Sequence, residues 1–231
     1  MCGDKMRIGL FLGSFNPPHI GHVNIVREVL NRKLVDTVWV IPAYQNPNKN
    51  IDTSENFSHR YNMCKLMFEE LPHTYVNLIE SVIKPKYTYD LLNQLKTEYP
   101  GNDFIWIITD ETLIEIIYGQ WYNSDELLEE NKFIIVEGTG KYNEEYPDEY
   151  YEIVKSQVNK CIYLQNPINM SSTQIRKMVE DDIIPVPFVN NETYKICKTL
   201  YKNDNNKNIW LILTFVFVGL SISSILIIDF M

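Results

Sequence analysis

The sequence lacks the features that mark nucleic-acid-binding, disulfide-rich and repeat proteins. It contains no block of Lys or Arg, and its formal net charge is −9 at pH 7. The electrostatic attraction that dominates nucleic-acid binding is therefore missing, which argues against a DNA or RNA partner. The four cysteines are scattered, form no CxxC pair and follow no secretory signal peptide, so we expect reduced thiols in the cytosol. No internal repeat is present. What is left is an ordinary globular composition, with 45% hydrophobic and 22% charged residues in 231.

Short apolar runs alternate with helix-length segments along the chain. Runs rich in β-branched and aromatic residues predict strands at residues 7–12, 37–41, 75–79, 104–109, 133–136 and 161–164. Helical patterns are expected between them, at residues 23–33, 58–70, 89–98, 124–130 and 172–180. Strands that are apolar on both faces and separated by helices indicate a parallel sheet covered on both sides. The predicted fold class is α/β, a doubly wound parallel sheet that binds ligands at the carboxyl ends of its strands.

The C-terminal end differs from this pattern. Residues 1–200 form the predicted globular domain, 201–208 a polar linker, and 209–228 a segment without a single charge. Its length of about 20 residues matches the roughly 30 Å hydrocarbon core of a bilayer, and fourteen of its residues are Leu, Ile, Phe or Val. Lys202 and Lys207 precede it and no basic residue follows, so the positive-inside rule places the globular part in the cytosol. We expect a tail-anchored protein; the alternative is a long hydrophobic helix packed on the domain, which normally keeps a polar face.

A second segment with an unusual composition lies at residues 141–152, which are acidic and rich in tyrosine. We expect a solvated loop and the start of a helix there.

The most informative stretch is residues 13–22, Gly-Ser-Phe-Asn-Pro-Pro-His-Ile-Gly-His, between the first predicted strand and the first predicted helix. A strand that ends in such a turn and continues into a helix start suits a polyphosphate, because helix amides and the helix dipole attract its charge. His19 and His22 are three residues apart and lie on one side of the first helical turn, where Gly21 gives a ligand close access to the backbone. Both rings are expected to donate to phosphate oxygens.

These residues resemble a known family. Residues 13–22 look like the HxGH nucleotidylyltransferase signature, in the G-[TS]-F-[DN]-P-x-H-x-G-H form of the nicotinate and nicotinamide mononucleotide adenylyltransferases. Residues 170–176, Met-Ser-Ser-Thr-Gln-Ile-Arg, are similar to that family's ISxTxxR motif, with Met170 where Ile is usual. Tyr87-Thr88 and Trp121-Tyr122 resemble the segments that surround its pyridine ring. The resemblance covers roughly residues 6–200, and the spacing of the motifs is similar to that of the bacterial nicotinate type.

The resemblance implies a Rossmann-like enzyme of NAD biosynthesis. Such an enzyme transfers AMP from ATP to the 5′-phosphate of nicotinate or nicotinamide mononucleotide and releases pyrophosphate, with Mg²⁺ carried by the ATP phosphates and no metal bound by the protein. The attacking phosphate is already an anion, so catalysis reduces to alignment and charge stabilisation.

The resemblance also implies a role for each matching residue. The implied catalytic residues are His19, His22 and Arg176. The implied ATP contacts are Gly13, Ser14, Phe15, Gly21, Ser171, Ser172, Thr173 and one of Asp110 and Glu111. The implied contacts with the mononucleotide are Asn16, Lys49, Tyr87, Thr88, Trp121 and Tyr122.

Three segments depart from the family pattern. Thr109-Asp110-Glu111 stands where the family has Gly-x-Asp, which leaves open whether Asp110 or Glu111 contacts ribose. Residues 46–49 replace Pro-Pro-His-Lys, keeping Lys49 without the histidine, and residues 137–140 replace an Arg-Pro-Gly turn.

Two alternatives stay open at this point: another HxGH enzyme, such as a phosphopantetheine adenylyltransferase or a cytidylyltransferase, and a membrane-tethered nucleotide sensor without turnover. The sequence leaves the choice of pyridine, the membrane and the oligomeric state open.

Overall fold

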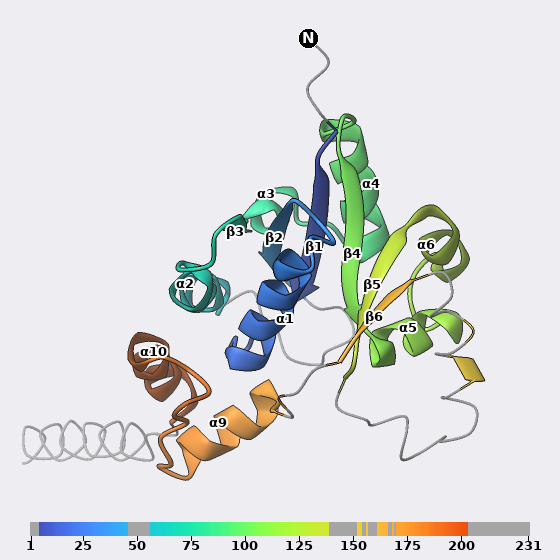
Figure 1. The fold of residues 1–231 in the computed structure, drawn as a ribbon. Helices are drawn as coiled ribbons and strands as arrows, with labels where there is room; N and C mark the ends of the chain where they lie inside the picture. The colour runs from blue at the N-terminus through green and yellow to red at the C-terminus, as the bar shows by residue number, and fades with distance from the viewer. Residues whose placement is uncertain are drawn as a thin grey trace, which may run out of the picture.

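The computed structural model describes residues 5–45, 56–138, 152–153, 156, 161–165, 168 and 170–202. They contain a six-stranded parallel sheet in the order β3-β2-β1-β4-β5-β6 (Figure 1). The strands are β1 (Arg7–Gly13), β2 (Thr37–Pro42), β3 (Thr74–Val76), β4 (Asp103–Thr109), β5 (Lys132–Val136) and β6 (Ile162–Leu164). The strand order reverses between β1 and β4, which confirms the predicted doubly wound α/β fold and places a ligand-binding crevice at their carboxyl ends.

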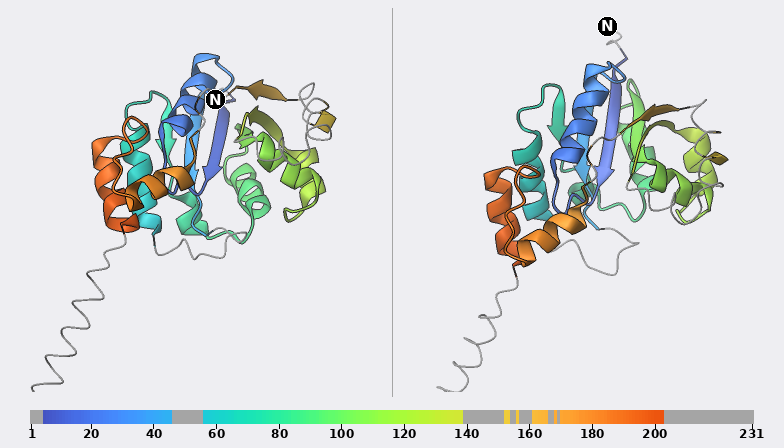
Figure 2. Two further views of the ribbon diagram at one scale, coloured as in Figure 1. Left: turned by 90° about the horizontal axis from the view of Figure 1, so that it is seen from below. Right: turned by 60° about the horizontal axis from the view of Figure 1, so that its bottom comes forward.

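Helices cover both faces of the sheet (Figure 2). They are α1 (Ile20–Asn31), α2 (Phe57–Phe68), α3 (Ile79–Ile83), α4 (Thr88–Glu98), α5 (Asp110–Ile117), α6 (Ser124–Glu130), α9 (Ser172–Glu180) and α10 (Asn191–Tyr201). Successive strand residues point to opposite faces, so Phe11 packs with α1 and α2 while Leu10 packs with α4, α5 and α6. The sheet therefore lies between two apolar cores, as its apolar runs predict.

The two C-terminal helices extend the first of these layers. Helix α10 packs against α2 and α9, and Met63, Val179 and Cys197 form a small buried cluster between the three helices. In the view of Figure 1, α9 passes below the carboxyl ends of the strands. This packing brings the start of α9, at Ser172 and Thr173, to the crevice, although the first strand lies more than 150 residues earlier in the chain.

Several predicted boundaries are wrong. Helix α1 begins at Ile20 instead of residue 23. His19 is its N-cap residue and has extended backbone angles, φ −148° and ψ 172°, so the helical conformation starts at the next residue. The predicted strand at 75–79 ends at Val76; Asn77 Oδ1 then accepts a hydrogen bond from the Ile79 amide at the start of α3. Helices α3, α5 and α10 are not among the predicted elements.

Some predictions lie outside the described residues: the contact from Lys49, most of the acidic segment 141–152, the linker beyond residue 202 and the hydrophobic segment 209–228. In the part of the chain that the structure describes, no helix has the length and apolarity needed to cross a membrane.

Candidate active site

A cavity of about 850 Å³ lies at the carboxyl ends of β1, β4 and β5. It brings together most of the predicted site residues, from five separate segments: Gly13, Ser14, Phe15, His19, Gly21, His22, Tyr87, Thr88, Glu111, Trp121, Tyr122, Ser171, Ser172 and Thr173. Asn16, Asp110 and Arg176 are not among its lining residues. The two main motifs thus face one space, large enough for a ligand of nucleotide size.

The turn after β1 is shaped by Phe15. This residue has a positive φ of 45°, and its ring is buried, in edge-to-face contact with Phe11 at 5.4 Å and Phe68 at 6.1 Å. A Cβ on Gly13 would lie 3.2 Å from the Phe15 ring, so glycine leaves room for this packing. Burying the ring directs the side chain into the core and leaves the backbone of the turn at the cavity wall.

His19 and His22 lie together at the start of α1, with their ring centroids 3.8 Å apart. The His19 amide donates to His22 Nδ1 at 3.1 Å, so the neutral His22 ring carries its proton on Nε2. A Cβ on Gly21 would come within 2.9 Å of His19 Nδ1, which explains the glycine between the two histidines. Burial lowers the pKa of His19 to about 4, and burial and the neighbouring His19 lower that of His22 well below its ordinary value. Both rings are neutral at pH 7 in the absence of ligand.

A buried arginine that was not predicted from the sequence binds the backbone of the turn after β1. Arg60 on α2 is fully buried, and its Nη1 donates to the Ser14 carbonyl while Nη2 donates to the Ala43 carbonyl, each at 2.7 Å. The guanidinium therefore ties the loop after β1 to the loop after β2. Burial lowers the pKa of the guanidinium, but the hydrogen bonds to the two carbonyls favour its charged form.

Three residues from the C-terminal part of the chain hold the same turn. Ser172 Oγ donates to the Pro17 carbonyl at 2.8 Å, and Arg176 Nη1 donates to the Asn16 carbonyl at 2.6 Å. Tyr201, at the end of α10, donates its hydroxyl to Asn16 Oδ1 at 2.5 Å. The predicted contact of Arg176 with the polyphosphate stays a prediction, because here its guanidinium binds the turn.

The two candidate ribose ligands occupy different environments. Asp110 is fully buried, and its Oδ1 accepts from the Glu111 amide at 2.8 Å and the Gly138 amide at 2.9 Å. Glu111 lines the cavity. A Cβ on Gly138 would lie 2.7 Å from Glu111 Cδ, so glycine permits the close approach of this side chain to the end of β5. The geometry favours Glu111 over Asp110 as the acid available to a ligand.

Aromatic side chains, among them Tyr87, Trp121 and Tyr122, form a further part of the cavity wall, which we call the aromatic end. The rings of Tyr87 and Tyr122 stack with centroids 4.3 Å apart and an interplanar angle of 18°. Trp121 packs edge-on against Trp106 at 5.7 Å, and its indole N–H donates to Glu115 Oε2 at 3.1 Å. This end suits a flat aromatic ring.

The charged residues Glu80, Lys86, Glu115 and Glu137 also line the cavity, although none of them was predicted. Lys86 Nζ lies 5.0 Å from the centroid of the Tyr87 ring. Glu80 accepts from the Tyr44 amide at 2.7 Å, and burial raises its pKa to about 7 against the lowering effects of that bond and of Arg60. The Glu80 contact joins distant segments, for which the sequence carries no local signal.

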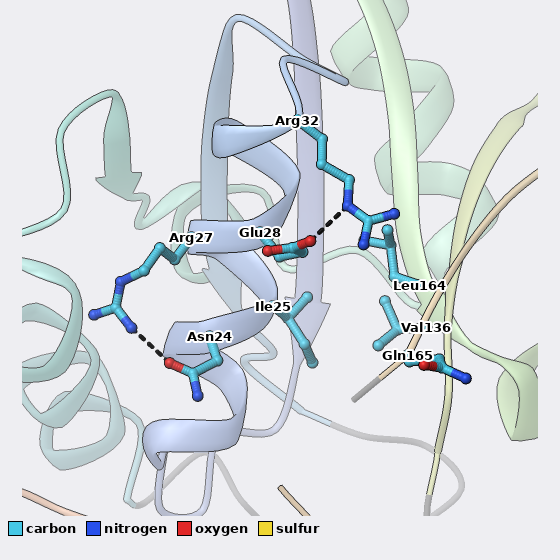
Figure 3. Close-up of a pocket in the computed structure, with 8 residues that line it drawn as sticks. All are labelled: Asn24, Ile25, Arg27, Glu28, Arg32, Val136, Leu164 and Gln165. Atoms are coloured by element: carbon cyan, nitrogen blue, oxygen red, sulfur yellow. Dashed lines mark hydrogen bonds and ion pairs between the residues drawn. The ribbon is translucent and has the colours of Figure 1, made fainter. Parts of the chain in front are cut away.

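A second cavity of about 420 Å³ lies between α1 and the strands β5 and β6 (Figure 3). Arg32 and Glu28 reach into it and pair with each other, while Val136 and Leu164 form its apolar wall. It contains neither the histidines nor the serine-rich helix start, so the larger cavity is the candidate active site. In the described part of the chain, no group of three or more His, Cys, Asp or Glu residues is placed to hold a metal ion.

Comparison with known proteins agrees with this site. Residues 10–178 match the cytidylyltransferase-like family. The chain is 33% identical over 179 residues to a probable nicotinate-nucleotide adenylyltransferase of Oceanobacillus iheyensis, covering 77% of this chain and 91% of that protein. It is 32% identical over 185 residues to the nicotinate-nucleotide adenylyltransferase of Bacillus subtilis, covering 76% and 96%. The chain belongs to the nicotinate-nucleotide adenylyltransferase family.

A solved structure shows the fold of this family independently. The nicotinic acid mononucleotide adenylyltransferase of Plasmodium falciparum, complexed with NaAD, superposes with a TM-score of 0.69 at 22% identity, over 85% of this chain and 97% of that one. The resemblance predicted from residues 13–22 and 170–176 is therefore confirmed at the level of the family and the fold. The roles of individual residues within the family pattern stay predictions.

Proposed function

We propose that this chain transfers AMP from ATP to the 5′-phosphate of nicotinate mononucleotide, forming deamido-NAD and pyrophosphate in NAD biosynthesis. Its membership of the nicotinate-nucleotide adenylyltransferase family supports this activity. The observation that carries the proposal is that the pair of neutral histidines at the start of α1 and the helix start at Ser171–Thr173 line the same cavity. Both supply hydrogen-bond donors to the space where a polyphosphate would lie.

The proposed reaction requires the protein mainly to position the two substrates and to stabilise the charge on their phosphates. The mononucleotide phosphate is the nucleophile and attacks the α-phosphorus of ATP, the new P–O bond forms as the bond to the β-phosphate oxygen breaks, and pyrophosphate leaves. His22 donates through Nε2–H to phosphate oxygens as their charge grows, and His19 lies against it. The amides of the turn and of the α9 start hold the remaining oxygens, and Glu111 is placed to accept from ribose hydroxyls. Mg²⁺ on the ATP phosphates would offset part of their negative charge.

The aromatic end of the cavity supports a pyridine mononucleotide as the acceptor. Tyr87, Trp121 and Tyr122 offer ring faces and edges, and Thr88 begins α4 beside them. The alternatives of a phosphopantetheine adenylyltransferase and of a cytidylyltransferase are not favoured by the named relatives.

The test is pyrophosphate release with ATP and Mg²⁺, measured with nicotinate mononucleotide and nicotinamide mononucleotide in turn. We expect release with the acid mononucleotide, and deamido-NAD as the second product. Binding of ATP without release would support a nucleotide sensor instead, and preference for the amide would change the assigned substrate.

We also propose that residues 209–228 anchor the protein in a membrane with the enzyme on the cytosolic side. The support is the sequence: twenty residues without a charge, preceded by Lys202 and Lys207. The full chain should float with phosphatidylcholine vesicles and resist extraction at alkaline pH, whereas a chain without residues 209–231 should do neither. Equal behaviour of the two chains would contradict the anchor.

A further inference from the structure

The connection between α9 and α10 exposes an unusual group of aliphatic side chains. Ile183, Ile184 and Val186 are 51%, 56% and 58% exposed. Single apolar residues on a surface are normal, but three within four residues on one loop form a concentrated apolar tip. We call this group the aliphatic tip.

The tip is held in a fixed shape by its own backbone. The Ile183 amide donates to the Met178 carbonyl at 2.7 Å, and the Val186 amide donates to the Ile184 carbonyl at 2.9 Å. Beyond the tip, the Phe188 carbonyl accepts from the Ile20 amide at 2.8 Å, which ties the loop to the start of α1. The aliphatic side chains therefore project from a loop fastened at both ends.

The tip also lies next to the point where the described chain ends. Lys202 follows α10, and its Nζ binds Asp182 Oδ1, one residue before the tip, at 2.6 Å. Figure 1 shows the α9–α10 connection and the end of α10 on the same side of the molecule. Residues 203–208 separate Lys202 from the hydrophobic segment and can span at most about 25 Å when fully extended. Chain length therefore limits the start of the hydrophobic segment to within about 25 Å of Lys202.

The acidic residues around the tip do not repel a lipid surface strongly, because two of them are paired. Asp181 binds Lys177 at 2.8 Å, and Asp182 binds Lys202. Three aliphatic side chains are too few to cover a segment that is apolar on all sides, so the hydrophobic segment itself is a poor occupant of this surface. A bilayer interface accommodates both the segment and the tip.

We propose that Ile183, Ile184 and Val186 insert into the interface of the bilayer that holds residues 209–228. This inference rests on the proposed membrane anchor and is independent of the proposed reaction. Helix α9 runs from the cavity, at Ser172, to the tip, and its nine residues span about 13 Å. The tip would therefore hold the start of α9, at the cavity, no more than about one helix length from the membrane.

The test uses the full chain in phosphatidylcholine vesicles, with Cys2 and Cys161 replaced by Ser and one new cysteine carrying an environment-sensitive fluorophore. The probe position is Ile184→Cys. The matched control is Ile162→Cys, which replaces an exposed aliphatic residue on β6, at the opposite edge of the sheet from the α2 and α10 side. We expect the probe at 184 to shift to shorter emission wavelength on vesicles and to be quenched by nitroxide-labelled lipid, and the probe at 162 to do neither.

Three results would overturn the inference. One is that the chain floats with vesicles while the fluorophores at positions 184 and 162 both keep the emission wavelength of an aqueous environment. Another is a shift at 184 that lipid nitroxides do not quench and that grows with protein density, which would indicate a second copy of the chain. The third is failure to float, which removes the anchor as well. Pyrophosphate release by the same samples reports on the proposed reaction separately and confirms that the labelled variants are folded.

Discussion

The hydroxyl of Tyr201, at the end of α10, donates to Asn16 Oδ1 in the turn that carries the two histidines, across 185 positions of sequence. Burial raises the pKa of Tyr201 above its ordinary value, so the hydroxyl is a neutral donor at physiological pH. The C-terminal helix is thus part of the active-site architecture.

Removing this hydroxyl should impair catalysis more than folding. In Tyr201→Phe, we expect kcat/KM for pyrophosphate release to fall about fivefold, the equivalent of roughly 1 kcal/mol for one hydrogen bond. The control is Tyr194→Phe on the same helix. If the bond acts through Asn16, the effects of Tyr201→Phe and Asn16→Ala should be less than additive; full additivity would show that the two residues act separately.

Shortening the chain provides a second test of α10. A chain ending at residue 202 keeps Tyr201 and should stay active, because the described contacts of the site end there. A chain ending at residue 200 should lose activity to at least the extent of Tyr201→Phe. Inactivity of the longer chain would mean that residues 203–231 contribute to the site.

The histidine pair should be essential for turnover. We expect His22→Ala to lower kcat by about 10²- to 10³-fold, the scale of losing one transition-state donor, with little change in the free energy of unfolding. His59→Ala, on the exposed face of α2, is the control. Near wild-type turnover in His22→Ala would contradict the catalytic role.

Arg60 should matter for stability as well as activity. In Arg60→Lys the ammonium cannot reproduce the fork that joins the Ser14 and Ala43 carbonyls, and a buried charge is left poorly paired. We expect the free energy of unfolding in denaturant to fall by about 2–4 kcal/mol. Arg32→Lys, at an exposed pair with Glu28, should change it by less than about 1 kcal/mol.

Glu80 should leave a signature in the pH dependence of stability. Its pKa is raised from 4.5 to about 7 in the folded chain, so the folded state holds an extra proton between these values. The associated stability is fully present below pH 4.5 and is lost as the pH rises through 7. Glu80→Gln cannot ionise, so on going from about pH 5 to about pH 8 it should lose roughly 2 kcal/mol less stability than the unmodified chain. As a control, substitution of the exposed Glu69 in Glu69→Gln should leave the pH dependence of the free energy of unfolding unchanged. If Glu80→Gln also showed the same pH dependence as the unmodified chain, the raised pKa of Glu80 would be contradicted.

The parts of the site that the sequence predicts are those whose chemistry is local. His19, Gly21 and His22 are neighbours in the chain, and Ser171 caps the helix that follows it, so spacing alone indicates their arrangement. Successive helical residues point about 100° apart, so only the packing of α5 on the sheet decides whether Asp110 or Glu111 faces the cavity.

Other residues could not be predicted because their roles exist only between distant segments. In the sequence, Arg60 resembles a surface residue of an ordinary helix, because its partners, the Ser14 and Ala43 carbonyls, lie in distant segments. Tyr201 acquires its partner Asn16 in the same way. The strand predicted at 75–79 failed for a local reason, since the Asn77 side chain starts a helix inside an apolar run.

The turn at residues 14–18 has more acceptors than donors, because Pro17 and Pro18 carry no amide hydrogen. Uncompensated carbonyl dipoles beside the cavity would repel a polyphosphate. The guanidinium groups of Arg60 and Arg176 bind the Ser14 and Asn16 carbonyls and so place two permanent positive charges immediately behind the turn. An acidic protein with a net charge of −9 thus holds two positive charges against the turn beside its cavity, built into the scaffold before any ligand arrives.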